Sequence, residues 1–159
     1  MKTYTKQELD EILRLHKLWL EDNKEGVRAD LRWADLRWAD LSSANLSRAD
    51  LSRADLRWAD LSSANLRSTN LRSTNLSSAN LRSANLSRAN LDKRYIQIAC
   101  IGSRKDMTTY CFEDDKIWCG CYTGTLEEFE KKVNETHKDK EQYRQEYMGF
   151  IKYLKMLKK

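Results

Sequence analysis

The sequence predicts a mainly β solenoid, preceded by an amphipathic helix and followed by a small α+β module. Three observations predict it: a leucine at every fifth residue through the middle of the chain, a small residue two positions before each leucine, and an abrupt end of this period near residue 93. We therefore expect an N-terminal capping helix in residues 1–27, the solenoid in residues 28–93 and the α+β module in residues 94–159.

The five-residue period defines the solenoid. Thirteen leucines recur without a gap from Leu31 to Leu91, each following alanine or threonine by two positions, with Asp or Asn in between. On an α-helix this step would spread the leucines over every face, and on one long strand an odd period would alternate them between opposite faces. A chain that changes direction once per repeat keeps both leucine and the small residue inside.

The A(D/N)LXX pattern, as in Ala44-Asn45-Leu46-Ser47-Arg48, resembles the pentapeptide-repeat family. The resemblance implies a right-handed quadrilateral β-helix with about four repeats, or about twenty residues, in each coil. Equivalent residues of successive coils would then lie about 4.8 Å apart, which is the spacing between paired strands.

The first segment predicts a helix over residues 6–22, beginning at a capping box formed by Thr5 and Glu8. We expect its apolar face to cover the open end of the solenoid, because unpaired strand edges and exposed leucines promote aggregation. His16 lies on this face, so we interpret it as a packed structural residue. The face is formed by Leu9, Ile12, Leu13, His16, Trp19 and Leu20.

Tryptophan and arginine share the outward positions in the first half of the array. With coils of about twenty residues, Trp38 stacks on Trp58, and Arg53 lies one coil from Trp33. Because both residue types are enriched at binding hot spots, we predict a binding surface for a macromolecule or a small ligand. The alternative is that the C-terminal module or a second copy of the chain covers it. This Trp-Arg surface comprises Trp33, Trp38, Trp58, Arg32, Arg37, Arg53 and Arg57.

Charge separates the functions that the resemblance implies. Several pentapeptide-repeat proteins mimic DNA in shape and acidity and occupy the DNA site of a type II topoisomerase such as gyrase. Here residues 28–60 hold six arginines against six aspartates, and residues 61–93 carry a net charge of +4. This disfavours DNA mimicry, because a mimic must present negative charge to a basic groove. Direct nucleic-acid binding by the basic half is an alternative, but scattered cations are more typical of a solvated surface.

The last segment predicts three strands followed by two helices. The strands are expected over Tyr95–Ile101, Met107–Phe112 and Lys116–Tyr122, and a capping box at Thr125 and Glu128 opens a helix that ends near His137. The residues Ile101-Gly102-Ser103-Arg104 and 119–126 resemble a module of phage and mobile-element proteins, which implies a phage origin.

Cysteine occurs only in the predicted strands, as Cys100, Cys111, Cys119 and Cys121. Without an export signal we expect free thiols. Cys119 and Cys121 would share one face of a strand and are weak candidates for a zinc site with His137 or Cys111. The Cys-x-Cys spacing is atypical of zinc sites, so we expect neither a metal nor a cofactor.

The final helix, predicted over residues 139–157, carries an apolar seam with alternating spacings of four and three residues. The seam either packs on the module's own sheet or forms a homodimer, the arrangement that the family resemblance favours. Its members are Tyr143, Tyr147, Phe150, Leu154 and Leu157.

Catalytic motifs are scarce. The two histidines lie in separate segments, and the five glycines form no phosphate-binding loop. Residues 1–26 contain neither a signal-peptide core nor a membrane-spanning run, so we expect a cytoplasmic location and no membrane contact. We therefore predict a non-enzymatic interaction protein that binds through the outer faces of the solenoid, as a phage-derived inhibitor or modulator of a bacterial protein.

Overall fold

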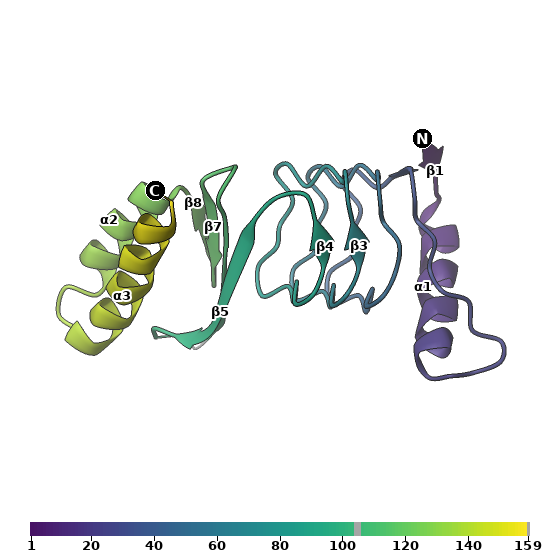
Figure 1. Cartoon of the computed structure of the whole chain (residues 1–159). Helices are drawn as coiled ribbons and strands as arrows, with labels where there is room; N and C mark the ends of the chain where they lie inside the picture. Colours follow the sequence, from purple (N-terminus) through teal and green to yellow (C-terminus); the bar gives the residue numbers. More distant parts are fainter. Residues whose placement is uncertain (104–105, 159) are drawn as a thin grey trace. The chain divides into compact units, whose positions relative to one another are not determined.

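The computed structural model describes residues 1–103 and 106–158, except for the side chains of residues 99, 100 and 106. The chain divides into two compact units, Met1–Asp92 and Lys93–Lys159. The elements of the first unit, drawn in Figure 1, are β1 (Lys2–Thr3), α1 (Lys6–Leu20), β2 (Ala34–Asp35), β3 (Asn70–Leu71) and β4 (Asn90–Leu91). Those of the second unit are β5 (Tyr95–Ile101), β6 (Asp106–Cys111), β7 (Lys116–Cys119), β8 (Tyr122–Gly124), α2 (Leu126–Thr136) and α3 (Glu141–Leu157).

The repeat array of the first unit forms a solenoid whose coils contain four repeats. Parallel bridges join Asp30 to Asp50, Asp35 to Asp55 and so on to Asn65 with Asn85, and β3 pairs with β4 in the same register. Twelve of the thirteen leucines, all except Leu91, are buried inside the coils. The prediction that leucine faces inward is therefore confirmed, and the side view of Figure 1 shows the coils stacked one beside the next.

A left-handed residue turns every corner of the coil. From Trp33 to Arg88, the second residue after leucine has a positive φ in all twelve repeats, between 54° and 63°. The next backbone N–H donates back to the leucine carbonyl, as Ala34 does to Leu31 at 3.2 Å. Positive φ at the third position is the geometry of a type II turn. Sequence reasoning did not find this feature, because Ser, Arg and Trp are not residues that normally indicate a left-handed backbone.

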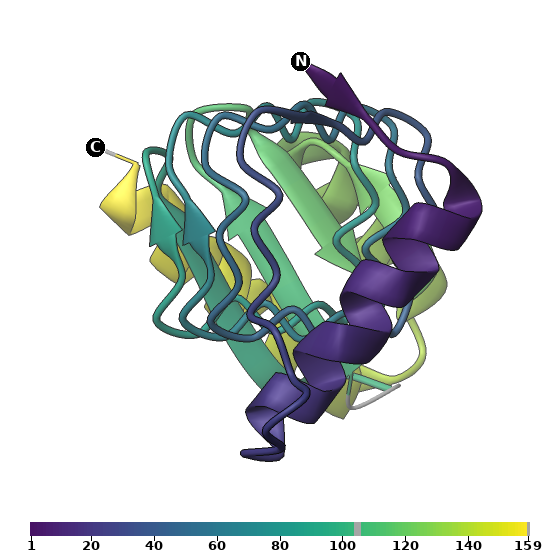
Figure 2. The ribbon, with the colours of Figure 1, turned by 90° about the vertical axis from the view of Figure 1, so that its right-hand side faces the viewer.

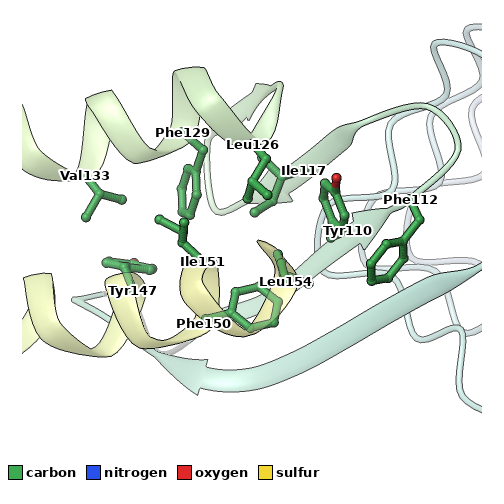
Figure 3. Packing of buried hydrophobic residues seen from close by; sticks show 10 residues of the cluster. All are labelled: Tyr110, Phe112, Ile117, Leu126, Phe129, Val133, Tyr147, Phe150, Ile151 and Leu154. Carbon is green, nitrogen blue, oxygen red and sulfur yellow. The ribbon is translucent and has the colours of Figure 1, made fainter. Parts of the chain in front are cut away.

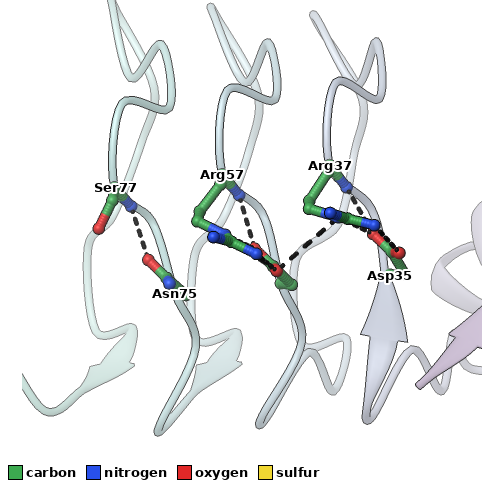
Figure 4. Close-up of polar contacts among 6 residues, drawn as sticks. Asp35, Arg37, Arg57, Asn75 and Ser77 are labelled. Carbon is green, nitrogen blue, oxygen red and sulfur yellow. Dashed lines mark hydrogen bonds and ion pairs between the residues drawn. The ribbon is translucent and has the colours of Figure 1, made fainter.

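The Asp or Asn of each repeat holds the following turn. Its Oδ1 accepts a hydrogen bond from the backbone N–H two residues later, as Asp35 does from Arg37 at 3.3 Å and Asn75 from Ser77 at 3.0 Å (Figure 4). Asp and Asn side chains commonly make this local bond in turns. The position is therefore structural even though it faces outward.

Helix α1 lies across the N-terminal end of the coils (Figure 2). It begins at Lys6, after the N-cap residue Thr5, whose predicted capping box with Glu8 is present, and it ends two residues earlier than predicted. Leu9 and His16 are its buried residues, and Ile12, Leu13, Trp19 and Leu20 are half-buried. β1 pairs in parallel with β2, so both α1 and β1 cover part of the first coil.

The second unit contains a four-stranded antiparallel sheet in the order β5-β6-β7-β8. Its core lies between this sheet and the two helices, and Figure 3 shows Phe129 of α2 and Ile151 of α3 pointing into it. The second capping box, formed by Thr125 and Glu128, is present as predicted. The remaining core residues are Tyr110, Phe112, Ile117, Leu126, Val133, Tyr147, Phe150 and Leu154.

The prediction of one strand over Lys116–Tyr122 is wrong. β7 ends at Cys119, which pairs with Tyr122 of β8, so Gly120 and Cys121 form a two-residue hairpin loop. Gly120 has a φ of 53°, a conformation that glycine adopts without steric cost. The hairpin adds a fourth strand to the sheet and places Cys121 in the loop, outside the strand that contains Cys119.

Candidate protein-interaction surface

Two tryptophans form a stacked pair on the outside of the solenoid. The ring centroids of Trp38 and Trp58 are 4.9 Å apart, with an angle of 8° between the ring planes. Both residues occupy the left-handed turn position, and the backbone N–H of Trp38 donates to Arg57 O at 3.2 Å. The coil register therefore places equivalent side chains one above the other. Trp38 is 71% exposed and Trp58 is 42% exposed, so the pair presents apolar area to solvent.

A second aromatic contact involves Trp33, which is also exposed. The guanidinium of Arg53 lies over its ring, with Cζ 4.6 Å from the ring centroid. Arg57 makes a similar contact with Trp58 at 5.3 Å. Such cation–π contacts keep the arginine side chains against the rings. The predicted neighbours Trp38 and Trp58, and likewise Trp33 and Arg53, are therefore in contact.

Most arginines of the Trp-Arg surface are paired with the aspartate two residues before them. Arg32, Arg37 and Arg57 contact Asp30, Asp35 and Asp55 respectively at 2.6 to 2.7 Å. Arg37 also lies 3.9 Å from Asp55 of the next coil, so the pairs are linked across coils (Figure 4). The arginines therefore neutralise the negative charges of Asp30, Asp35 and Asp55.

Hydrogen bonding by arginine shifts the acidity of these carboxyl groups. The Arg37 side chain, together with the Arg37 backbone N–H, lowers the pKa of Asp35 to about 2 against the opposing effect of desolvation. Arg57 acts in the same way and holds the pKa of Asp55 below its ordinary value. Both carboxylates are thus ionised at neutral pH, and the face is a mixed-charge surface around an aromatic centre.

A groove borders Trp38, a feature that sequence reasoning missed. It has a volume of about 540 Å³ and lies between the α1 region and the first coil. Its lining combines the apolar Leu13 and Trp38 with the charged Lys6, Asp10 and Asp40. The spacing of the repeats could not indicate it, because the groove exists only where helix α1 crosses the coils.

The predicted dimer seam of α3 packs within its own unit. Tyr147, Phe150 and Leu154 are buried in the core between the helices and the sheet. Tyr143 and Leu157 are half-buried. Intramolecular packing therefore explains the apolar spacing, and homodimerisation through this seam stays a prediction.

Cys119 and Cys121 do not lie on one strand as predicted, although both line a pocket of the second unit together with His137. Cys119 accepts a hydrogen bond from Thr108 Oγ1 at 3.1 Å, Cys111 is buried, and Cys121 is exposed in the hairpin loop. The side chain of Cys100 lies outside the described residues. Within the part of the chain that the structure describes, no group of three His, Cys, Asp or Glu side chains is suited to hold a metal ion.

The coil register and the inward leucines define the class of protein: a β-helix solenoid with an N-terminal helix across one end. A family model described as pentapeptide repeats matches residues 29–67 and 59–93, with eight copies. Residues 29–93 are therefore a pentapeptide-repeat array, which confirms the resemblance seen in the sequence. Pentapeptide repeat proteins are generally non-enzymatic interaction proteins.

Solved pentapeptide repeat proteins are similar to part of the chain. HetL of the cyanobacterium Nostoc, involved in the regulation of heterocyst differentiation, is 38% identical over 39% of this chain and 30% of its own, with a TM-score of 0.38. A protein from the thylakoid lumen of Arabidopsis thaliana is 31% identical over 39% of this chain and 43% of its own, with a TM-score of 0.38. One from the cyanobacterium Cyanothece is 36% identical over 42% of each chain, with a TM-score of 0.32.

The chain thus covers less than half the length of each of these three proteins. No curated protein matches the sequence. Among the residues that the structure describes, no helix has both the length and the apolar character needed to cross a bilayer.

Proposed function

We propose that this chain is a non-enzymatic interaction protein that binds a protein partner through the Trp-Arg surface. The observation that carries the proposal is the stacked, exposed pair Trp38–Trp58. Tryptophan and arginine are enriched among the few residues that supply most of the binding energy at protein interfaces. The groove beside Trp38 extends this surface toward α1 and gives a partner a concave edge to occupy.

The partner that we propose is a bacterial protein, and the chain is proposed to act as its phage-derived inhibitor or modulator in the cytoplasm. The resemblance of the C-terminal module to phage and mobile-element modules supports this context. A homodimer joined through the C-terminal unit would present two copies of the Trp-Arg surface. Such a bivalent arrangement raises the apparent affinity for a partner that also has two sites.

The ion pairs disfavour the family's DNA-mimic mode at a type II topoisomerase. On the Trp-Arg surface, Asp35 and Asp55 are each bound by an arginine, so they do not form a continuous negative strip. A DNA mimic depends on such a strip to enter a basic groove. We expect no inhibition of gyrase supercoiling at a stoichiometric amount of this protein; inhibition at that ratio would favour DNA mimicry instead.

The test compares partner capture by three forms of the protein. Trp38→Ser combined with Trp58→Ser removes the stack, and serine suits the site because Ser78 occupies the same turn position with a positive φ. Arg48→Ser combined with Arg88→Ser is the matched control at equivalent turn positions outside the Trp-Arg surface. Proteins captured from a bacterial lysate are identified, and the affinity of a purified candidate is then measured for each form.

We expect the double tryptophan variant to weaken binding at least about tenfold, because loss of a hot-spot aromatic costs roughly 2 kcal/mol. The control variant should bind like the wild type, and both variants should keep the wild-type melting temperature within a few degrees. A tryptophan variant that loses stability or self-association, while keeping its affinity for the partner, would show that the surface is covered within the protein's own assembly.

A further inference from the structure

We propose that a pocket in the second unit binds a small planar molecule carrying one anionic group. The pocket has a volume of about 480 Å³ and lies between the β7–β8 hairpin and the helices α2 and α3. Small-molecule sites typically have volumes of about 300 to 1,000 Å³. This site is separate from the Trp-Arg surface and does not depend on the function proposed for it.

Aromatic side chains form the walls of the pocket. Phe129 of α2 contacts Tyr147 of α3 edge to face, with ring centroids 5.7 Å apart, and it contacts Tyr122 of β8 at 5.2 Å. Phe129 and Tyr147 are buried in the core of the unit, which fixes their rings. Tyr122 is half-buried and is held in place by its contact with Phe129, so a planar ligand can pack on the open part of the Tyr122 ring with little reorganisation of the protein.

The charge of the lining favours an anion. Lys132 of α2 and Lys140, which precedes α3, both line the pocket and are exposed at its mouth. The described residues that line the pocket include no Asp or Glu. Two ammonium groups without a carboxylate among the lining residues attract a carboxylate or a phosphate. The hydroxyl group of Thr136 offers a further hydrogen bond.

His137 provides an independent indication of a ligand. Its side chain lines the pocket and is 9% exposed, and its buried Nδ1 has no hydrogen-bond partner among the described residues. The ring stacks on Tyr147 with centroids 5.5 Å apart. A buried polar atom without a partner is unfavourable and is uncommon in folded proteins. Because Nδ1 itself has almost no accessible surface, the ring must rotate slightly before a polar group of a ligand can supply the partner.

The experiment is a titration followed by two-dimensional NMR of the full chain. Two matched pairs of probes separate charge from shape: 2-naphthoate against 2-naphthamide, and adenosine 5′-monophosphate against adenosine. The first pair tests a carboxylate and the second a phosphate. We expect at least one anion to bind at least about fivefold tighter than its neutral counterpart, and to shift the imidazole signals of His137.

Two double variants distinguish the pocket from the general charge of the protein. Lys132→Ala with Lys140→Ala removes both cations of the pocket, and we expect it to weaken anion binding about fivefold to tenfold. Lys131→Ala with Lys138→Ala removes two exposed lysines that do not line the pocket, and should change the affinity less than about twofold. The proposal is overturned if no probe binds at millimolar concentration, if each neutral probe binds as well as its anion, or if the control variant weakens binding equally.

Discussion

His16 Nδ1 accepts a hydrogen bond from the backbone N–H of Ala29 at 3.1 Å, at the point where the first coil begins. Its Nε2 lies 3.0 Å from Ser47 O. Ser47 directly follows a leucine, and in the next repeats the carbonyl at this position accepts a hydrogen bond from a backbone N–H of the preceding coil. Ser52 O, for example, accepts from the backbone N–H of Trp33. The imidazole thus takes the place of the missing backbone partner, and it must be neutral, with the proton on Nε2, to make both bonds.

Removal of this side chain should destabilise the first unit. His16→Ala leaves the Ala29 N–H and the Ser47 carbonyl without their partner and opens a cavity where a fully buried ring had been. We expect a loss of about 2 to 4 kcal/mol in the free energy of unfolding. Urea denaturation measures it, with Arg14→Ala as the control, because the exposed Arg14–Glu11 pair on the same helix should contribute little to the free energy of unfolding.

The same histidine should make stability depend on pH. Burial lowers the pKa of His16, assisted by the positive charge of Arg28 and opposed by the Ser47 carbonyl. The unfolded chain therefore takes up a proton more readily than the folded chain. The contribution of neutral His16 to the free energy of unfolding is fully present above about pH 6.5 and decreases as the pH drops below that value. His16→Gln should make the denaturation midpoint depend less on pH between pH 7.5 and 5. The same pH dependence in this variant and in the wild type would contradict the attribution of the effect to His16. The Asp35 carboxyl, with a pKa of about 2, stabilises the fold throughout this pH range, and its contribution is lost only at more acidic pH, below about 4.

Asp55 should tolerate asparagine better than alanine. Its Oδ1 accepts from the Arg57 backbone N–H at 3.1 Å, and Asn75 makes the equivalent bond to Ser77 one coil later. Asparagine keeps this acceptor and loses only the charge, so Asp55→Asn should cost less than about 1 kcal/mol. Asp55→Ala also loses the turn bond and should cost about 1 to 2 kcal/mol more. An equal loss in the free energy of unfolding for the two variants, measured by denaturation, would show that Asp55 stabilises the fold through its ion pair rather than through the turn hydrogen bond.

Leu61→Lys should prevent the first unit from folding. Leu61 is fully buried inside the coils, and a lysine there would place a charge without a partner among leucines. Circular dichroism should show loss of the cooperative transition of this unit. Ser62→Lys is the matched control one residue further on, at a half-buried position outside the leucine core, and should retain the transition. A cooperative melt in Leu61→Lys would contradict the observed register.

Gly102→Ala should disturb the second unit. Gly102 has a φ of +68°, and a Cβ built at this position would lie 1.9 Å from the Tyr147 ring. Because Tyr147 belongs to the core and lines the pocket, its displacement should cost about 1 to 3 kcal/mol and should weaken binding of the anionic probes. Gly149, with open space around its Cβ position and a place within α3, is the control; Gly149→Ala should be neutral or stabilising. A stable Gly102→Ala variant with wild-type probe affinity would argue against this packing.

The sequence alone determined the solenoid. A period of five residues with a small residue and leucine at fixed positions is satisfied only if the chain turns once per repeat, so the burial of Leu31 to Leu86 followed from the period. The stacking of Trp38 on Trp58 also required the coil of about twenty residues that the resemblance to pentapeptide-repeat proteins implied. Both capping boxes were also predicted, because they depend on residues three apart in the sequence.

The tertiary structure decided the features that depend on contacts between distant segments. Gly120 ends β7 early because it permits a tight hairpin, which no alternation of side chains revealed. The apolar seam of α3 packs with α2 and the sheet, a choice that its spacing left open. The two bonds of His16 and the unpartnered Nδ1 of His137 likewise arise only when the helices meet their neighbours. Local periodicity fixes which side chains face inward, whereas the partners of those side chains depend on packing across the fold.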